Sequence, residues 1–327
     1  MELKVTVIVP VYNVEEYLAR CLDSLLNQTF DDYEIICVND CSPDGSAAIL
    51  RKYQKNYPSR IRIVTNEVNL GLGQSREKAL DFASGEYVLI VDSDDYVKPD
   101  YIERYMLGME EGDYDIVVGG FIRVVDGKQR EHILSDSVWS STTYAIACAK
   151  LFKLSFIRAH NLRFTSVSCG EDIYFSLSAF YHGASVKVLN YAGYYYVLNR
   201  GSITGSMNYK KNHERIMAEL FESFLQNHDL SLIAEDRRRV IEYVYLANMV
   251  NALVTFNRGC GIKLMREKYN FVRNNAMELF PDCMSNPYIG VFKPSGQTFK
   301  IRLGVSVVMG LEKIHLARFL FYLVSLI

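Results

Sequence analysis

The sequence of 327 residues has little that would cross-link the chain or place it in a membrane. Its seven cysteines are an odd number without C-x-x-C spacing, which argues against a disulfide or zinc framework and favours thiols in a reducing compartment. No uninterrupted apolar run reaches the roughly 20 residues that a membrane span requires. The chain starts with a short strand-like run instead of the apolar region of a signal peptide. We therefore expect a cytoplasmic protein.

Several common ligand motifs are also missing. There is no Walker-type phosphate loop, and Gly71-Leu72-Gly73 followed by Arg76 lacks the third glycine of a dinucleotide fingerprint. An EF-hand is excluded because no Asp-x-Asp-x-Asp-Gly loop has a glutamate at its twelfth position. With 36 basic and 38 acidic residues the formal charge is -2, so no overall field would attract nucleic acid. An anionic ligand must therefore be held by local groups.

What the chain does contain is enough apolar residue to fold, since 49% of it is hydrophobic and 23% is charged. Apolar runs alternate with helical patterns through the first half, which predicts an α/β fold with a doubly wound, mostly parallel sheet flanked by helices. The predicted strands are 5–9, 34–38, 61–65, 87–91, 115–118 and 184–189, with a hairpin turn at 126–127.

Local signals predict how some of these elements begin and end. Pro10 is expected to end the first strand, and Asn13 is expected to cap the following helix together with Glu16. The mixed apolar and basic stretch 144–160 is predicted to be helical.

Beyond about Thr204 the pattern becomes helical, so we expect a first domain at 1–204 and a helical C-terminal region at 205–327. The last 25 residues are strongly apolar but contain four interrupting polar residues, Glu312, Lys313, His315 and Arg318. On one continuous helix these would scatter around the axis. A membrane-touching anchor and a tail packed on the domain are therefore both open.

The most informative stretch is Asp92-Ser93-Asp94-Asp95, which follows a buried apolar strand. In doubly wound sheets, ligands bind beyond the carboxyl ends of the strands. That edge should also collect 10–12 and 39–40, which follow two other strands. Two carboxylates one residue apart can offer oxygen ligands to Mg²⁺ or Mn²⁺, with a diphosphate completing the site. In isolation, a capped turn explains the same stretch equally well.

Two further features have competing interpretations. Glu171 and Asp172 precede an apolar-periodic run, so they lie at a helix amino end. Carboxylates are stabilised there by the helix dipole, so the pair can be either a simple helix-end feature or catalytic. The tyrosines at 194–196 are more typical of a core than of a site.

Separated stretches of the chain resemble, in order and spacing, the family 2 glycosyltransferases of the GT-A fold. The resemblance covers about residues 3–204 and is carried by 5–13, 21–29, 38–46, Gly85-Glu86-Tyr87 before the acidic stretch, and Gly170-Glu171-Asp172.

This resemblance implies roles for individual residues on the donor side. Pro10 and Tyr12 would line the nucleotide base pocket, and Asp40 would read the uracil edge. Asp92 would lie near the ribose, and Asp94 would be the direct ligand of a metal site, for Mn²⁺ or Mg²⁺, to which Asp92 also belongs.

It also implies an arginine near the nucleotide, Arg76, and a catalytic base, Asp172, with Glu171 beside it. The chain departs from the family pattern at Glu77, where asparagine is frequent, and at Val197, where an arginine is frequent. The residues that could replace that arginine are Asn199 and Arg200.

The implied function is an inverting, metal-dependent hexosyl- or N-acetylhexosaminyl-transferase. It would move a sugar from a nucleotide donor, expected to be UDP-linked, to a hydroxyl of a glycan or lipid-linked saccharide. The alternative is a non-catalytic nucleotide-sugar-binding or scaffold subunit of a glycan assembly complex. We expect no nucleic acid partner, and a cytoplasmic location with peripheral contact at the inner membrane face through the C-terminal tail.

Overall fold

The computed structural model describes residues 3–135, 139–143, 146–165, 167, 169–199 and 207–326. The chain divides into two compact units, each described by itself. The first comprises Met1–Ser166 and Glu171–Asn199, and the second comprises Val167–Gly170 and Arg200–Ile327.

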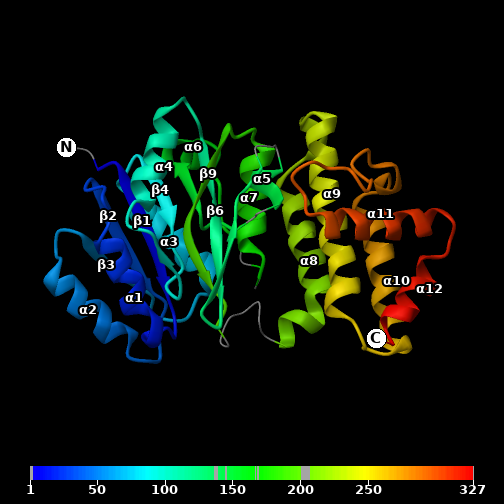
Figure 1. Ribbon diagram of the computed structural model, residues 1–327, viewed down its shortest axis with the longest axis horizontal. Coiled ribbons are helices and arrows are strands. Elements are labelled where there is room, and N and C mark those ends of the chain that lie inside the picture. Colours follow the sequence, from blue (N-terminus) through cyan, green and yellow to red (C-terminus); the bar gives the residue numbers. More distant parts are fainter. Residues whose placement is uncertain are drawn as a thin grey trace. The chain divides into compact units, whose positions relative to one another are not determined.

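The first unit is built on one sheet with the strand order β3-β2-β1-β4-β8-β6-β9-β5, and β7 pairs with β6 (Figure 1). Its described strands are β1 Val5–Val11, β2 Tyr33–Asn39, β3 Ile61–Thr65, β4 Tyr87–Ile90, β5 Tyr96–Val97, β6 Ile116–Val125, β7 Lys128–His132, β8 Lys150–Lys153 and β9 Val186–Val197. The first four strands, β6 and β9 run in one direction, while β5, β7 and β8 run opposite to their neighbours. The prediction of a mostly parallel sheet is confirmed.

Helices follow the strands and pack on the sheet. Those of the first unit are α1 Glu15–Leu26, α2 Ser46–Asn56, α3 Leu72–Phe82, α4 Tyr101–Glu110, α5 Ser140–Thr143, α6 Leu154–Ala159 and α7 Glu171–Tyr181. Helix α3 lies against β1 and β2, and α4 lies against β6 and β9.

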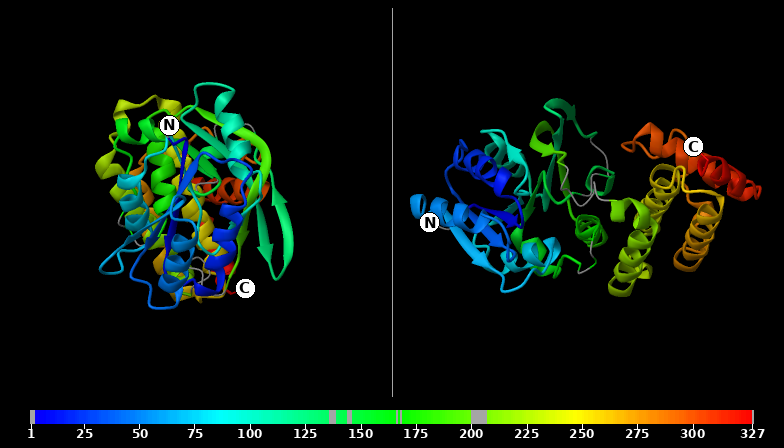
Figure 2. Two further views of the ribbon diagram at one scale, coloured as in Figure 1. Left: turned by 90° about the vertical axis from the view of Figure 1, so that its left-hand side faces the viewer. Right: turned by 90° about the horizontal axis from the view of Figure 1, so that it is seen from below.

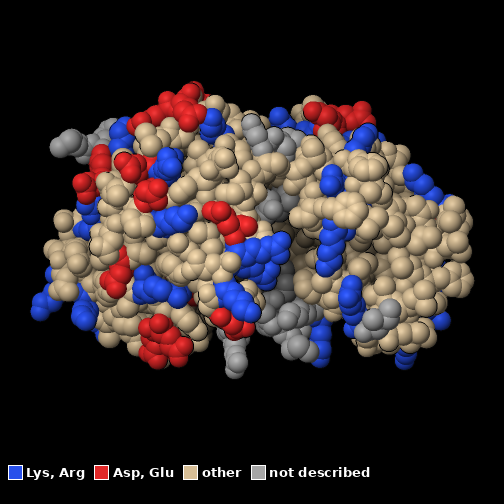
Figure 3. Space-filling model, in the orientation of Figure 1, with Lys and Arg blue, Asp and Glu red and all other residues tan. Residues whose placement is uncertain are grey.

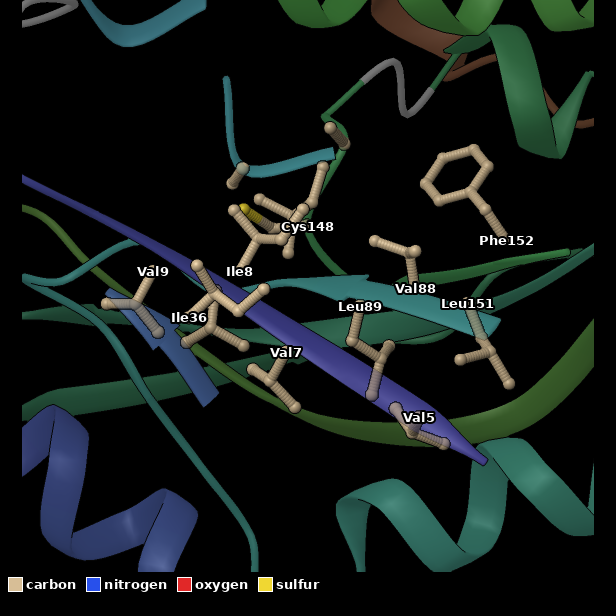
Figure 4. Close-up of a cluster of buried hydrophobic side chains, with 14 of the residues drawn as sticks. Val5, Val7, Ile8, Val9, Ile36, Val88, Leu89, Cys148, Leu151 and Phe152 are labelled. Carbon is tan, nitrogen blue, oxygen red and sulfur yellow. The ribbon is translucent and has the colours of Figure 1, made fainter. Parts of the chain in front are cut away.

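The centre of the sheet is buried on both faces. Every residue of β1 is buried, and its alternate side chains pack with those of β4 and β8 (Figure 4). Val7 and Leu89 lie on one face, while Ile8 and Val88 lie on the other. Burial on both faces explains why these strands are continuous apolar runs instead of alternating ones. The carboxyl ends of the strands are thereby held in fixed positions.

The expectation that Pro10 ends the first strand is wrong. Strand β1 continues to Val11, with Pro10 opposite Val38 of β2. The carbonyl of Ile8 accepts a bond from Val91, so alternate residues of β1 present their backbone groups toward β4. Because β4 ends at Ile90, a backbone N–H at position 10 would meet no partner strand there, and proline is tolerated.

The expected cap of α1 is also wrong. Asn13 has a left-handed φ of 55° and does not cap the helix. The first amides of this region bond to side chains of a distant loop instead: Glu15 N donates to Asp44 Oδ2 at 2.8 Å, and Asn13 N donates to Ser42 Oγ at 2.7 Å. Tertiary hydrogen bonds therefore replace the local capping box.

The stretch 144–160 is helical only in part. Residues 150–153 form β8, which pairs antiparallel with both β4 and β6. Its Leu151 and Phe152 are buried in the core, and α6 follows. The helical prediction is therefore wrong for 150–153, and Tyr144 and Ala145 lie outside the described residues.

The described part of the second unit is helical, as predicted. Its elements are α8 Met207–Asn227, η2 Leu230–Leu232, α9 Glu235–Asn251, η3 Ala252–Phe256, α10 Ile262–Leu279, η4 Cys283–Ser285, α11 Phe299–Lys313 and α12 Ala317–Val324. The apolar tail is two helices and not one, because the chain turns at His315, whose φ is 60°. Helix α11 packs on α9 and α12 packs on α10. None of the helices among the described residues has the length and apolarity needed to cross a membrane.

Candidate functional site

The acidic stretch after β4 is fastened to β9 through its last carboxylate. Asp95 Oδ2 accepts a bond from the Tyr194 hydroxyl at 2.5 Å, and Asp95 Oδ1 accepts one from Val197 N at 2.7 Å. The same hydroxyl accepts a bond from Asp92 N at 3.2 Å. Asp95 is buried and both of its oxygens are engaged, so it shapes the stretch. Tyr194 is buried, as expected of a core residue, and also positions the site.

Asp94 lies beside this fastening and is half-buried. Burial and the nearby charge of Asp92 raise the pKa of Asp94 to about 6. Its Oδ2 accepts a bond from Asn199 Nδ2 at 2.6 Å, which leaves Oδ1 without a partner among the described residues. Among the same described residues, Asp92 uses only Oδ1, in an ion pair with Arg76 at 2.6 Å. Two carboxylate oxygens therefore remain available at this edge of the sheet.

Carboxylate oxygens are suitable ligands for a hard divalent cation, but two of them fill only part of its coordination sphere. Within the residues that the structure describes, no group of three or more His, Cys, Asp and Glu side chains is arranged to hold a metal ion. Mg²⁺ usually binds through one or two carboxylates and fills its other positions with water and substrate phosphates. The donor set of Asp92 and Asp94 is compatible with that mode of binding.

Arg76 of α3 connects the acidic stretch with the start of α7. Its side chain has no exposed surface and forms ion pairs with three carboxylates. Nη2 donates to Asp92, while Nη1 donates to Asp172 at 2.5 Å and to Glu171 at 3.3 Å. One guanidinium thus holds Asp92 together with Glu171 and Asp172, which lie about 80 positions later in the chain. The structure brings together Arg76, Asp92, Glu171 and Asp172.

The carboxylates of α7 are poised to bind protons. Burial and the neighbouring Asp172 raise the pKa of Glu171 to about 7, against the opposing charge of Arg76. Burial also raises the pKa of Asp172, again opposed by Arg76. The side chain of Asp172 retains 20% of its exposed area, so a ligand can reach it. Such a carboxylate is a stronger base than a solvated aspartate.

Lys150 is a charged residue near Asp172 that the sequence did not single out. It is buried on β8 and donates to Ser176 Oγ, one turn after Asp172 on α7, at 2.8 Å. Burial lowers the pKa of Lys150 to about 7, although the charge of Asp172 opposes this shift. No local sequence signal marks this lysine, because its position follows from the pairing of β8 with the distant strands β4 and β6.

Asp40 after β2 mainly holds the chain's own backbone. Its Oδ1 accepts from Asn66 Nδ2 at 2.7 Å and from Leu70 N at 2.8 Å, and its Oδ2 accepts from Gly71 N at 2.8 Å. Asn66 also donates to Ser75 Oγ, the neighbour of Arg76. A carboxylate offers about four acceptor positions, three of which are filled here, and only 3% of Asp40 is exposed. Asp40 therefore shapes the loop before α3.

Pro10 and Tyr12 lie at the carboxyl end of β1, next to Asp40. The carbonyl of Val11 accepts a bond from Asp40 N at 2.9 Å, so the ends of β1 and β2 are tied together. Pro10 is buried, whereas the ring of Tyr12 is 46% exposed. An exposed aromatic ring at a strand end is available to stack on a planar ligand.

The departures from the family pattern have structural explanations where they are described. Glu77 forms an ion pair with Arg163 and accepts a bond from Phe164 N at 3.0 Å, so it fastens the segment before α7. Val197 contributes its backbone amide to Asp95. Asn199 reaches Asp94, and Arg200 lies outside the described residues.

Comparison with known sequences identifies the family. A family model described as glycosyl transferase family 2 matches residues 6–169. A poly(ribitol-phosphate) beta-glucosyltransferase of Bacillus spizizenii is 30% identical over 78% of this chain and 41% of its own length. A putative glycosyltransferase of Bacillus subtilis, EpsH, is 31% identical over 73% of this chain and 71% of its own length. The chain thus spans less than half of the first of these relatives.

A solved structure shares the fold. The crystal structure of residues 1–349 of TarS from S. aureus superposes with a TM-score of 0.70 at 21% identity, covering 99% of this chain and 90% of that one. The predicted GT-A-type fold is thereby confirmed. The matched family model and the similar relatives lead to one conclusion, that this chain belongs to glycosyltransferase family 2.

Proposed function

We propose that the protein is an inverting glycosyltransferase that uses a UDP-linked hexose or N-acetylhexosamine to extend a glycan or a lipid-linked saccharide. The observation that carries this proposal is the bridge made by Arg76, which holds the donor-side Asp92 and the partly exposed Asp172 in one cluster. A complex of TarS with UDP-GlcNAc has the same fold, with a TM-score of 0.65, which supports a UDP-sugar as donor.

The proposed reaction is a single displacement. The acceptor hydroxyl loses its proton to Asp172 as its oxygen forms a bond to the anomeric carbon. The bond from that carbon to the diphosphate oxygen breaks on the opposite face, and the nucleoside diphosphate leaves with the electron pair. The raised pKa of Asp172 suits it to take this proton near neutral pH, and Arg76 holds the carboxylate in place.

On the donor side, Tyr12 and Pro10 would contact the base, Asp40 its polar edge and Asp92 the ribose. Asp40 is only 3% exposed and accepts bonds from Asn66, Leu70 N and Gly71 N, so its contact with the base would be limited to the one acceptor position left of about four. Arg76 has no exposed surface, so it would act on the nucleotide through Asp92 and without touching it.

Asp94, with Asp92, would hold Mn²⁺ or Mg²⁺. Such an ion supplies positive charge to the departing diphosphate. A mannosyltransferase of Pyrobaculum calidifontis, whose structure contains GDP-Man and Mn²⁺, shares the fold with a TM-score of 0.59 at 14% identity. The free oxygens of both aspartates support the same position here.

The test is sugar transfer, or slow donor hydrolysis, with a panel of UDP-sugars and Mn²⁺. We expect Asp172→Asn to lose transfer and Asp94→Asn to lose metal-stimulated turnover, each by about 100-fold or more. Asp95→Asn is the comparison that separates a ligand from a structural neighbour: it breaks the bond from Tyr194 and should lower stability and activity together, without a change in metal dependence. Unchanged activity in Asp94→Asn would remove the metal assignment.

A non-catalytic scaffold role is the alternative, and the site does not favour it. Glu77 and Val197, the two departures from the family pattern, both make bonds that hold the segments of the site. Binding of UDP without turnover on any acceptor would revive this alternative.

For location, we propose a cytoplasmic enzyme that touches the anionic inner face of the membrane with α11 and α12. Exposed apolar side chains recur along both helices and at the residues next to their ends, namely Phe299, Leu303, Val307 and Ile314, then Leu316, Phe319, Leu323 and Leu326. The single acid between 283 and 326, Glu312, is buried, whereas Lys293, Lys300, Lys313 and Arg318 are exposed. Apolar stripes with surrounding cations fit an anionic lipid surface.

Vesicle co-sedimentation tests this location. Phe319→Ser with Leu323→Ser should weaken binding to phosphatidylglycerol vesicles by about tenfold or more, since two exposed apolar side chains are lost. Leu232→Ser, which alters a more exposed leucine of η2, is the control. Equal binding by all three proteins would argue against membrane contact through these helices.

A further inference from the structure

The hairpin formed by β6 and β7 carries an unusual pair of like charges. Arg123 lies directly opposite Arg130 in the antiparallel register. Side chains opposite each other in such a pair have Cβ atoms about 5 Å apart, and like charges there destabilise the hairpin. Both arginines are exposed, and Lys128, opposite Val125, lies on the same face of the hairpin. The hairpin therefore concentrates three cations on one face.

The acids of the hairpin do not neutralise this face. Glu131 neighbours Arg130 in the strand, so its side chain lies on the opposite face, and Asp126 is in the turn. Within the described residues, Arg123, Lys128 and Arg130 form neither ion pairs nor hydrogen bonds through their side chains. In Figure 3, Lys and Arg side chains gather over the β6–β7 hairpin, near the middle of the view.

This cationic face is continuous with the candidate site through β9. Arg123 lies beside Tyr196 and Phe121 lies beside Tyr194 in the parallel register of β6 with β9. Because residues two apart share a face, Arg123 is on the same face as Tyr194, whose hydroxyl bonds Asp95. Neighbouring strands are about 5 Å apart, so the arginine lies close to the segment that holds the acidic stretch.

The end of the hairpin is joined to that segment directly. The amide of Leu198 donates to the carbonyl of Val124 at 2.9 Å, and the next residue, Asn199, bonds Asp94. The hairpin extends at the edge of the first unit, where both strands are visible in the left-hand view of Figure 2. A long ligand that leaves the site along β9 would pass over Tyr196 and reach the three cations.

Protection of the sheet edge is the simpler explanation, since charged residues on edge strands discourage aggregation. It accounts for lysine and glutamate on β7 but does not require two arginines to face each other. Such a pair is stabilised when an anion lies between the guanidinium groups, which match phosphate oxygens with two parallel hydrogen bonds.

We propose that Arg123, Lys128 and Arg130 bind phosphate groups along an anionic acceptor, so that the enzyme glycosylates a polymer with phosphodiester links. This inference rests on the proposed transferase function, because it names the acceptor class of the same site. The cations hold the polymer beside the site while one of its hydroxyls reaches Asp172.

The experiment measures binding of the full chain to a fluorescent poly(glycerol phosphate) oligomer without any sugar donor. Arg123→Gln with Arg130→Gln should weaken binding by roughly tenfold, and the loss should shrink as salt is raised. Arg51→Gln with Lys52→Gln removes the same charge from exposed positions of α2 and should bind like the parent protein. A neutral dextran oligomer and a polygalacturonate of similar length should bind more weakly than the phosphate polymer.

Equal binding by the hairpin variant and the parent protein would overturn the proposal. So would equal affinity for polygalacturonate, because the site would then select charge and not phosphate. In steady-state transfer, the hairpin variant should raise the KM for the acceptor more than the KM for the donor. A rise confined to the donor KM would assign the cations to the donor diphosphate. Because binding is measured without donor, its failure is separate from a failure of donor hydrolysis, which decides the transferase proposal.

Discussion

Replacing Arg76 is the most informative perturbation of this site. The guanidinium has no exposed surface and pairs with Asp172 at 2.5 Å, with Asp92 at 2.6 Å and with Glu171 at 3.3 Å. Arg76→Met keeps the length of the side chain but leaves three carboxylates without their shared cation. Removing one partner of a buried ion pair costs about 3–5 kcal/mol. We therefore expect a fall of about 10 °C in the unfolding midpoint of the variant.

The same change should alter catalysis in a way that a purely structural defect would not. Arg76 lowers the pKa values of Glu171 and Asp172, so its loss raises both further. A base works only when it is deprotonated, and the acid limb of the pH profile of kcat/KM should therefore move to higher pH. The acid limb of Arg76→Lys should lie between those of the parent protein and of Arg76→Met. A single ammonium cannot bond Asp92 and Asp172 through separate nitrogens, as the guanidinium does.

Urea unfolding and pH-dependent transfer check this reasoning together. Stability within about 1 kcal/mol of the parent protein, with an unmoved acid limb, would refute it. Asp172→Asn is the control, because it removes the proposed base itself and should lower activity at every pH, while the fold keeps most of its ion pairs.

Other predictions concern stability. Burial lowers the pKa of His213 to about 4, so the unfolded chain binds its proton first as pH falls below 6.5. Urea unfolding should show about 3 kcal/mol of stability lost between pH 6.5 and 4, and His213→Phe should reduce this loss. A Cβ at Gly85 would lie 2.6 Å from the backbone N of Thr6, so Gly85→Ala should lower the melting temperature by several degrees. Gly71→Ala should cost about 1 kcal/mol, because its φ is 85° but nothing lies within 4 Å.

The sequence predicts the parts of this fold that depend on short-range pattern. Apolar runs mark β1 to β4, and the acids after β4 lie where a doubly wound sheet should place them. Glu171 and Asp172 begin α7, as the apolar-periodic run after them predicts. The hairpin turn at 126–127 also appears where Asp and Gly predict it.

The errors come from bonds between distant segments. Asn13 does not cap α1, because Asp44, about 30 residues later, accepts the bond from the first amide of the helix. Residues 150–153 join the sheet because β4 and β6 offer partners on both sides, which no local propensity shows. The positions of Lys150 near Asp172 and of the Tyr194 hydroxyl at Asp95 also depend on contacts between distant segments, so the local sequence does not predict them.

The bonds between the starts of α1 and α2 have a consequence for donor binding. Glu15 N donates to Asp44, and Gly45 N donates back to Glu15 at 2.5 Å, so the loops after β1 and β2 clasp each other. Hydrogen bonds from neighbours outweigh burial and lower the pKa of Asp44 to about 2, which keeps the clasp charged under mild acid. A nucleotide base entering beside Tyr12 would therefore meet loops that are already ordered, so binding would not have to order them. The association rate of the donor should then depend on diffusion to the site and not on a slow ordering of these loops.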